Sequence, residues 1–427
     1  MLSIQRKIFF LIICIQFSIQ TCCAIVEDSN ANITLNLKSI TLSKAIELGV
    51  LNNPTLKAAR AKLGISDAQI LQAGLLSNPN IISDNGFAED TFRVGIEQTI
   101  ELGNKRSRRI KLAKMQKEVV HQEIITTMLD VRSKVRSSYI QTYNAQQKLL
   151  ASREILETIT NLEKIAKERE KKGNVENLDI LQAEITVINA KNNIQSAKLE
   201  LNEAFNSLSA NIGKHLNRTI VLAPPDLMKE FNIPTSMVEN DKTINTLIES
   251  AYANRPEIKA IEKNIEVQNQ KLKLAHSNIV PDLKMTVGAD FVTGNTKRNS
   301  TFVMGSLGVP IFNRQQGVIK EVKAQKLVYE NDLDAIKIKI EQEVKNAYFG
   351  VIANAKSLNI YEKELIPHAK KIVKKSEISF KEGKSNILIP INSQEAYINT
   401  QYRYIQTLTQ YEQSVSDLER AIGLYHK

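Results

Sequence analysis

Residues 53–58 read Asn-Pro-Thr-Leu-Lys-Ala, and residues 255–260 read Arg-Pro-Glu-Ile-Lys-Ala, so one short pattern occurs twice in the chain. Two further pairs recur at this offset of 202 residues: Ala73 with Ala275, and Pro79 with Pro281. Three later pairs recur at an offset eight residues longer: Phe92 with Phe302, Gly173 with Gly383, and Gly213 with Gly423. A repeat of this length that includes the turns indicates an internal duplication. We expect a first structural repeat at residues 25–223, an inter-repeat linker at 224–243 and a second repeat at 244–427.

The composition is that of long helices rather than of ordinary globular domains. The 427 residues include no Trp, 16 Gly, 10 Pro and 5% aromatic residues. This scarcity of helix-breaking and bulky residues is typical of extended helices that pack side by side. We therefore predict a mainly α-helical fold.

The N-terminal segment has the pattern of an export signal. Arg6 and Lys7 precede an apolar run at residues 8–15, and small residues end near Ala24, so residues 1–24 are expected to form a signal peptide. The run is too short to anchor the chain across a bilayer, and no later stretch supplies the roughly 20 apolar residues of a transmembrane helix. We expect the exported chain either to be soluble in the periplasm or to span a membrane as strands.

All three cysteines, Cys14, Cys22 and Cys23, lie in or beside this segment, so no disulfide framework is expected in the rest of the chain. Attachment of a lipid to Cys22 or Cys23 is an open alternative. Gln20 and Thr21 fit poorly with the small residues that precede a lipidated cysteine.

Each copy of the duplication is predicted to contain a short helix, a proline break, a second helix, two strands and a long helical hairpin. The first short helix covers residues 41–51, and Pro54 pushes the residue before it out of helical geometry. The second helices are expected from Pro54 to about Leu76 and from Pro256 to about Ser277.

Two stretches in each copy alternate apolar and polar residues with the period of two that a β-strand requires. In the second copy we expect strands at residues 283–291 and 301–311, and in the first copy a strand at residues 92–97 after a tight turn at 88–90. Strands of about 10 residues can cross a membrane when tilted. Four strands cannot close a barrel in lipid, because their open edges leave backbone groups unpaired, whereas three copies would supply about 12 strands.

The stretch at 106–172 has no proline or glycine and predicts a helix on the order of 100 Å long. Its counterpart spans residues 316–382, with a kink expected at Pro367. Gly173 and Gly383 are expected to reverse the chain, since glycine readily takes the left-handed conformation that ends helices. The helix that follows Gly173, which we call the first return helix, carries a small residue at every seventh position: Ala183, Ala190, Ala197 and Ala204. Small residues at this spacing let neighbouring helices approach closely.

Five motifs together carry a family resemblance. They are Asn-Pro-x-Leu-x-Ala-Ala (53–59), Ala-Gly-Leu-x-x-Asn-Pro (73–79), Glu-Leu-Gly-x-Lys-Arg (101–106), Gly-Val-Pro-Ile-Phe-Asn-Arg (308–314), and the run Gly173, Asp179, Leu181 and Ala183. From about Leu42 to Gly423 the chain resembles the TolC family of outer-membrane efflux proteins, and within it the CzcC/CusC-like heavy-metal efflux branch. In the family, the last motif resembles the hairpin tip that meets a periplasmic partner.

The resemblance implies a homotrimer in which four strands per chain contribute to a shared 12-stranded membrane β-barrel, continued by a long periplasmic α-helical barrel. It implies a passive conduit in the outer membrane of a Gram-negative-type bacterium. The implied partners are a periplasmic adaptor (membrane fusion protein), an inner-membrane pump of RND type and outer-membrane lipid, with no nucleic acid. Heavy-metal cations are the cargo that this branch implies, and a type I secretion exporter is the alternative.

The hairpin tips hold the candidate site residues. The candidate residues for the tips and for contact with the adaptor are Gly173, Asp179, Leu181, Ala183 and Gly383. The second tip departs from the pattern of the first, because an isoleucine and a proline stand at 389 and 390 where an acidic residue is expected.

Carboxylates gather at the first tip, where a trimer would repeat each one three times, as in the acidic rings of cation pores. We interpret Glu168 and Glu170 as helix-surface charges. Glu176 and Asp179 are the candidate pore-lining acids, and Asp179 has the alternative role of stabilising a helix N-terminus.

The sequence offers no pattern for catalysis, cofactor binding or metal binding. The five histidines, at positions 121, 215, 276, 368 and 426, are not paired at metal-ligand spacing, and there is no nucleophile elbow, phosphate loop or cysteine pair. We expect a protein that is not an enzyme and binds no cofactor.

The net charge of +11 favours a second class, a basic coiled-coil protein that binds nucleic acid or an anionic membrane. Against it, basic and acidic residues are interleaved along the helices, and export separates the chain from nucleic acid. A periplasmic adaptor is a third class, but adaptors typically have one helical hairpin where this chain has two.

Overall fold

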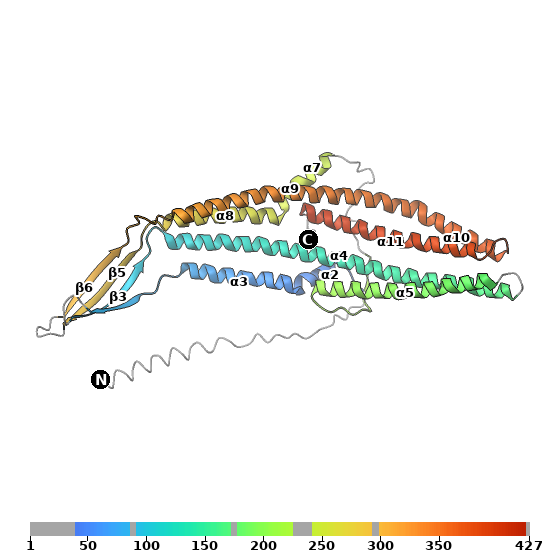
Figure 1. The fold of residues 1–427 in the computed structure, drawn as a ribbon, viewed down its shortest axis with the longest axis horizontal. Coiled ribbons are helices and arrows are strands. Elements are labelled where there is room, and N and C mark those ends of the chain that lie inside the picture. The colour runs from blue at the N-terminus through green and yellow to red at the C-terminus, as the bar shows by residue number, and fades with distance from the viewer. Residues whose placement is uncertain (1–38, 86–90, 172–176, 225–240, 293–298, 424–427) are drawn as a thin grey trace, which may run out of the picture.

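The computed structural model describes residues 39–85, 91–171, 177–224, 241–292 and 299–423. The molecule is elongated: a strand sheet forms one end, and two helical hairpins reach to tips at the other (Figure 1). Within these residues, no helix combines the length and the apolar character that a membrane crossing requires. The predicted signal peptide, the candidate lipid sites Cys22 and Cys23, and most of the predicted linker lie outside the described residues.

The first repeat contributes two short parallel strands, a four-helix framework and two longer strands. Its elements are β1 (Ser39–Ile40), α2 (Leu42–Asn52), α3 (Pro54–Gly74), β2 (Asn80–Asn85), β3 (Thr91–Ile100), α4 (Lys105–Glu170), α5 (Asn177–Ile212) and β4 (Val221–Leu222). The short strands β1 and β4 pair with each other in parallel.

The second repeat follows the same order, with its long helix divided into three parts. Its elements are α7 (Asp241–Asn254), α8 (Pro256–Ser277), β5 (Leu283–Val292), β6 (Ser300–Leu307), α9 (Gln316–Ile360), the π-helix η1 (Tyr361–Leu365), α10 (Ile366–Lys381) and α11 (Leu388–Ile422).

The break between α2 and α3 is built by Asn53 and Pro54. The Asn53 side chain accepts hydrogen bonds from the backbone N–H groups of Thr55 and Leu56, at 2.9 and 3.2 Å, and so caps α3. Pro54 stands at the start of the helix, where its missing N–H would have no helical partner. The Asn53 side chain also donates to the Asn211 carbonyl at 2.7 Å, which ties the break to the end of α5.

Each return helix ends at a glycine that packs against the proline break of its own repeat. Gly213 has a φ of +80° and Gly423 a φ of +68°, a region that favours glycine. A Cβ atom on Gly213 would lie 2.8 Å from the Asn52 carbonyl oxygen, and one on Gly423 would lie 3.0 Å from the Asn254 Cβ. The recurrence of these glycines in the sequence therefore has a steric cause.

The strands form one antiparallel sheet in the order β2-β3-β5-β6. The central pair, β3 and β5, joins the two repeats, with Phe92 opposite Phe291. The predicted strand at 301–311 was too long, because β6 ends at Leu307. Pro310 lacks the N–H that a continued ladder would need.

The predicted long helix at 106–172 is confirmed as α4. In the second copy the long helix is interrupted directly before Pro367, where a kink was predicted. The irregularity is the π-helix at 361–365, and Pro367 lies in the first turn of α10. Proline cannot donate the helical hydrogen bond to the residue four positions earlier, and a π-turn accommodates one extra residue in a helix.

The extra residue is visible when the two repeats are compared. Before the π-helix, buried residues correspond at an offset of 209, as Val135 and Tyr139 do with Val344 and Tyr348. After it the offset is 210, as for the return-helix pairs Phe205 and Val415, Leu208 and Leu418, and Ile212 and Ile422. The π-helix is therefore a one-residue insertion in the second copy.

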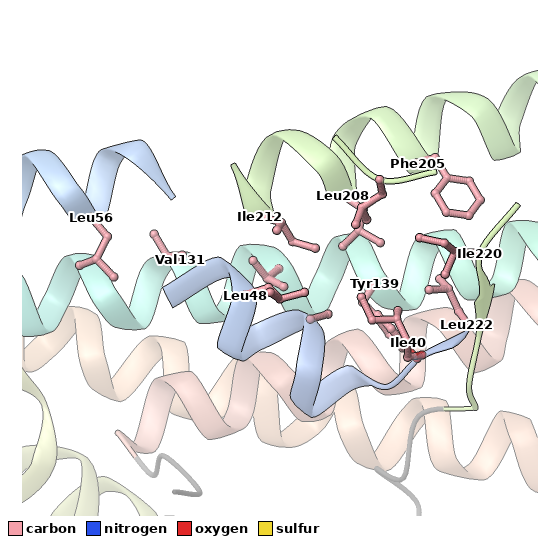
Figure 2. Close-up of a cluster of buried hydrophobic side chains, with 13 residues drawn as sticks. Ile40, Leu48, Leu56, Val131, Tyr139, Phe205, Leu208, Ile212, Ile220 and Leu222 are labelled. Carbon is pink, nitrogen blue, oxygen red and sulfur yellow. The ribbon is translucent and has the colours of Figure 1, made fainter. Parts of the chain in front are cut away.

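Each repeat has its own hydrophobic core at the middle of the molecule, where the short helix packs on the hairpin. In the first repeat, Leu208 and Ile212 of α5 and Leu48 of α2 meet over α4 (Figure 2). The Tyr139 hydroxyl donates at 2.9 Å to the Ile40 carbonyl and lies 2.7 Å from the Ala223 carbonyl, so it ties α4 to β1 and the end of β4.

Towards the tips, the helices form a row in which α4 contacts α5 on one side and α11 on the other, and α11 contacts α9 and α10 (Figure 1). Towards the sheet, a second row has the order α3, α4, α8 and α9. The ends of the row near the tips are thus α5 and α9–α10.

Candidate functional site: the strand sheet and the hairpin tips

One face of the sheet is apolar and exposed. Alternation along the paired strands places large apolar side chains on this face in all four strands: Ile81, Phe92, Ile96, Val287, Phe291, Val303 and Leu307. Ile81 is 83% exposed and Val303 69% exposed, so no residue that the structure describes covers them.

The opposite face of the sheet is polar. The Arg93 guanidinium donates to the Asp290 carboxylate at 2.8 Å and stands 4.5 Å from the centre of the Phe302 ring. Lys284 pairs with Glu97 at 3.4 Å on the same face. The sheet is therefore amphipathic, with one apolar face and one polar face.

The junction between sheet and helices uses the motif at 101–106. Lys105, which is buried, contacts the Asp282 carboxylate of the second repeat at 2.7 Å, and Asp282 also accepts from the Leu102 backbone N–H at 3.3 Å. Arg106 donates to the Gly74 carbonyl at 2.6 Å. The motif therefore locks α4 to α3 and to the other repeat at the start of β5.

Of the predicted tip residues, Gly173 and Glu176 lie outside the described residues. Asp179 lies half-buried in the first turn of α5, and Leu181 is exposed. Gly383 has a φ of +77°, and its N–H donates to the Phe380 carbonyl at 3.0 Å, as a helix-ending glycine does.

Ala183 faces inward. It belongs to a cluster that joins the tips of both hairpins, made of Ala166, Ala183, Phe380, Ile387 and Ile391. Its side chain is buried, whereas that of Leu181 is 50% exposed.

Two basic residues at the tips were missed by the sequence analysis. Arg169 donates to the Phe380 carbonyl, and its guanidinium stands 4.6 Å from the centre of that ring, which clasps the first tip to the second. Lys167 contacts Glu163 at 2.6 Å and Glu184 at 2.8 Å, and these hydrogen bonds raise the pKa of Lys167. The sequence gave no signal for either contact, because the alternating charged residues near the helix end do not indicate which side chains they meet.

A polar seam joins the hairpins between α4 and α11. It consists of four side-chain pairs: Asn144 with Thr409 at 2.6 Å, Ser137 with Gln413 at 2.7 Å, Ser152 with Tyr402 at 2.9 Å, and Arg136 with Glu419. Polar pairs of this kind fix the register of helices more strictly than apolar contacts do.

Glu412 is buried in this seam, with an exposed fraction of 3%. Its Oε2 atom has no hydrogen-bond partner. Burial raises the pKa of Glu412 to about 7, although a hydrogen bond with Asn144 acts in the opposite direction. Tyr143 of α4 also has a raised pKa, mainly from burial and then from the charge on Glu412.

Within the described ranges, no group of three or more His, Cys, Asp or Glu side chains converges as metal ligands would. The structure thus combines an amphipathic sheet at one end with two long hairpins whose tips are joined at the other.

Comparison with known proteins agrees with this architecture. Residues 45–214 and 247–424 match the model of a family described as Outer membrane efflux protein. The cobalt-zinc-cadmium resistance protein CzcC of Cupriavidus metallidurans is 23% identical over 83% of each chain. Toxin and drug export protein A of Aggregatibacter actinomycetemcomitans is 21% identical over 74% of this chain and 70% of its own.

Solved structures of efflux channels have the same fold. A crystal structure of CusC aligns with a TM-score of 0.72 at 14% identity, over 90% of this chain and 92% of its own. The Campylobacter jejuni outer membrane channel CmeC aligns with a TM-score of 0.70 at 18% identity, over 90% of this chain and 85% of its own.

Proposed function

The chain belongs to the outer membrane efflux protein family, and we propose that three copies form the outer-membrane channel of a tripartite efflux system. The channel is a passive conduit from an inner-membrane pump and the periplasm to the exterior. It performs no chemistry of its own, and the energy for transport comes from the pump.

The open sheet is the observation that carries this proposal. Its edge strands β2 and β6 have no further partner strand among the described residues, and its exposed face is apolar. In hydrocarbon each unpaired backbone group costs several kcal/mol, so the edges must pair with other strands. Pairing β6 of one copy with β2 of the next, three times, gives a closed barrel of about 12 strands with its apolar face towards lipid.

The hairpins extend the conduit into the periplasm, and their tips are the proposed docking end for the adaptor. The proposed contact residues are Asp179 and Leu181 of the first tip and Gly383 in the turn of the second. Gly173, outside the described residues, belongs to the same proposal by its place in the sequence motif. Ala183 positions them from the shared cluster. Glu176 and Asp179 are the proposed pore-lining acids.

For the cargo we propose heavy-metal cations, supported by the resistance protein CzcC among the relatives. The relative that exports toxins and drugs supports a second candidate, a type I secretion exporter for polypeptides. A strain that lacks the gene separates the two. Loss of tolerance to cobalt, zinc or cadmium with intact secretion supports the first, whereas lost secretion with unchanged metal tolerance contradicts it.

Membrane fractionation tests the channel itself. We expect the mature chain in the outer-membrane fraction, extracted by mild detergent as a particle of about three times the monomer mass. The chain of 427 residues has a mass of 48.0 kDa. A detergent-independent monomer or dimer would replace the channel with the periplasmic adaptor or coiled-coil alternative.

A helix-breaking variant tests the wall. Ala190 is buried between α5 and α4, and proline within a helix costs about 3 kcal/mol or more, so Ala190→Pro should abolish trimer assembly and export. His121→Ala, at an exposed position in the first part of α4, is the control variant that should leave both intact. Normal export by the proline variant would contradict a helical wall.

A further inference from the structure

The net charge of the chain is concentrated where the helices meet the sheet. Seven basic residues lie at 105–117 in the first part of α4, two at 267–277 in the last part of α8, and three at 316–326 in the first part of α9. These three ranges contain a single acidic residue, Glu321. Their excess of eleven positive charges equals the formal net charge of the whole chain, +11, so the other residues balance. The interleaving of opposite charges along the helices therefore breaks down at this end of the molecule.

Two of these helices begin at the sheet, where a cation is electrostatically unfavourable. A helix N-terminus has a partial positive charge and is stabilised by acidic side chains, yet α4 and α9 have no acidic residue in the first turn. The first turn of α4 instead carries Lys105, Arg106 and Arg108. A local rule that is broken in this way is expected at a functional surface, where a ligand from outside the chain supplies the missing negative charge.

Five exposed lysines at this level lie on one side of the row of helices. We call them the basic belt: Lys111 and Lys114 of α4, Lys273 of α8, and Lys320 and Lys323 of α9. In the described residues none of these five lysines belongs to an ion pair or donates a side-chain hydrogen bond that the structure shows. The belt is thus a basic surface across three neighbouring helices.

The other side of the row is marked by two cavities, of about 590 and 400 Å³, which share the lining residue Leu274. At about 100° per residue, each belt lysine lies roughly 135–165° around its helix from the middle of the residues that line these cavities. The larger cavity is also lined by Glu101, which continues the alternation of Arg93 and Glu97 on the polar face of the sheet. The belt, on the opposite side, therefore continues the apolar face.

The belt also lies at the level where a membrane that held the sheet would end. At 1.5 Å per residue, its lysines stand roughly 6–14 Å along the helix axes from the helix ends nearest the sheet. Helical side chains tilt towards the N-terminus, so those on α4 and α9 lean towards the sheet. Between sheet and belt, Val309 is 75% exposed and Phe312 is 89% exposed, so apolar surface borders the lysines directly.

We infer that the basic belt binds the anionic headgroups of glycerophospholipids in the membrane leaflet that faces the periplasm. A surface that sets lysines beside exposed apolar side chains binds anionic lipid through apolar insertion together with electrostatic attraction. The phosphate of the headgroup supplies the negative charge that the helix ends lack. The inference rests on the proposed function for the position of the sheet in the membrane, and it adds the class of lipid that surrounds the channel.

Lipid binding by the full-length oligomer in mild detergent tests the belt. The probe is dioctanoyl phosphatidylglycerol, whose binding is followed by native mass spectrometry. Dioctanoyl phosphatidylcholine has the same chains and a headgroup without net charge. We expect the wild type to bind the glycerol lipid at least tenfold more tightly at 0.15 M ammonium acetate. The ratio should shrink at 0.5 M, since salt screens exposed charges.

A fourfold variant removes the belt lysines that lean towards the sheet: Lys111→Gln, Lys114→Gln, Lys320→Gln and Lys323→Gln. A lysine near an anionic membrane surface changes the affinity about fivefold. The variant should therefore bind phosphatidylglycerol at least tenfold more weakly than the wild type, with the affinity for phosphatidylcholine unchanged. If the fourfold variant does not assemble, the double variants of α4 and of α9 are measured separately, and each should weaken binding several-fold.

The matched control makes the same change of charge at the far end of the molecule. It replaces the exposed lysines 370, 371, 374 and 375 of α10 with glutamine, and it should bind phosphatidylglycerol as the wild type does. Before lipid is added, every variant should run in mild detergent as the wild-type oligomer, which shows that it has folded.

The outcomes distinguish this inference from the proposed function. Equal binding of the two lipids by the wild type, or undiminished binding of phosphatidylglycerol by the assembled belt variant, would overturn the inference and leave the channel standing. An equal loss in the α10 control would also overturn it, because net charge rather than position would then decide. So would an acidic protein that binds the wild type but not the belt variant while lipid binding is unchanged. A wild-type chain that needs no detergent would overturn both proposals.

Discussion

Replacement of Glu412 by glutamine should remove a pH-dependent weakness from the seam between the two hairpins. Burial raises the pKa of this carboxyl to about 7, from its ordinary value of 4.5. The folded protein therefore holds a proton that the unfolded chain releases above pH 4.5. The stabilisation is fully present below pH 4.5 and is lost as the pH rises towards 7.

The size of the effect follows from the shift. A difference of about 2.5 pKa units at 1.36 kcal/mol per unit corresponds to about 3 kcal/mol. Between pH 4.5 and 8, Glu412 should lower the free energy of unfolding of the wild-type chain by about this amount. Glutamine keeps the shape and hydrogen-bonding capacity of the neutral acid, so Glu412→Gln should lose this part of the pH dependence.

Thermal unfolding in mild detergent, followed by circular dichroism at several pH values from 4.5 to 8, measures the difference. The midpoint of Glu412→Gln should exceed that of the wild type at pH 8 and approach it at pH 4.5. Glu395→Gln, on the exposed side of the same helix, is the control and should follow the wild type. Parallel pH profiles for wild type and Glu412→Gln would refute the reasoning.

Three further changes test other parts of the molecule. Gly213→Ala places a Cβ against the Asn52 carbonyl at a positive φ, so the midpoint of thermal unfolding should fall by an amount equivalent to about 1–3 kcal/mol; an unchanged midpoint would contradict the steric argument. Arg136→Ala leaves the Glu419 carboxylate buried without its cation, at a cost of about 3–5 kcal/mol, and adding Glu419→Gln should restore much of it; failure of this rescue would argue against the ion pair. Val303→Lys, on the apolar face of β6, should reduce outer-membrane assembly by the roughly 2–4 kcal/mol of a lipid-facing charge; Met304→Lys on the polar face should assemble normally, and equal defects would contradict the assignment of the faces.

The fold could be predicted from the sequence where local chemistry decides the structure. The proline breaks after Asn53 and Arg255, the turn at Gly383 and the strand alternation all follow from the conformational limits of single residues. The same reasoning extended β6 too far, because alternation continues through Val309 although Pro310 cannot pair. It predicted an irregularity at Pro367 but did not identify the π-helix, since a proline in a helix does not determine which irregular turn precedes it.

The candidate sites were less predictable because they depend on contacts between distant segments. Glu412 stands in a stretch that reads as an ordinary helix surface, and it is buried because α4, nearly 270 residues earlier, packs over it. Arg169 and Phe380 are 211 residues apart, and only the meeting of two hairpin tips brings them together. Charge and periodicity within one helix contain no information about such partners.

The π-helix has a consequence for the surface of the hairpin beyond the change of offset. Exposed apolar side chains recur every eleven residues along α9, at Ile338, Phe349 and Ile360, a spacing that keeps a line almost parallel to the helix axis. An uninterrupted helix would put Lys371 next on that line. The single inserted residue instead advances Ile372 into the position, so an apolar line continues past the proline towards the tip and the lysine moves to its edge.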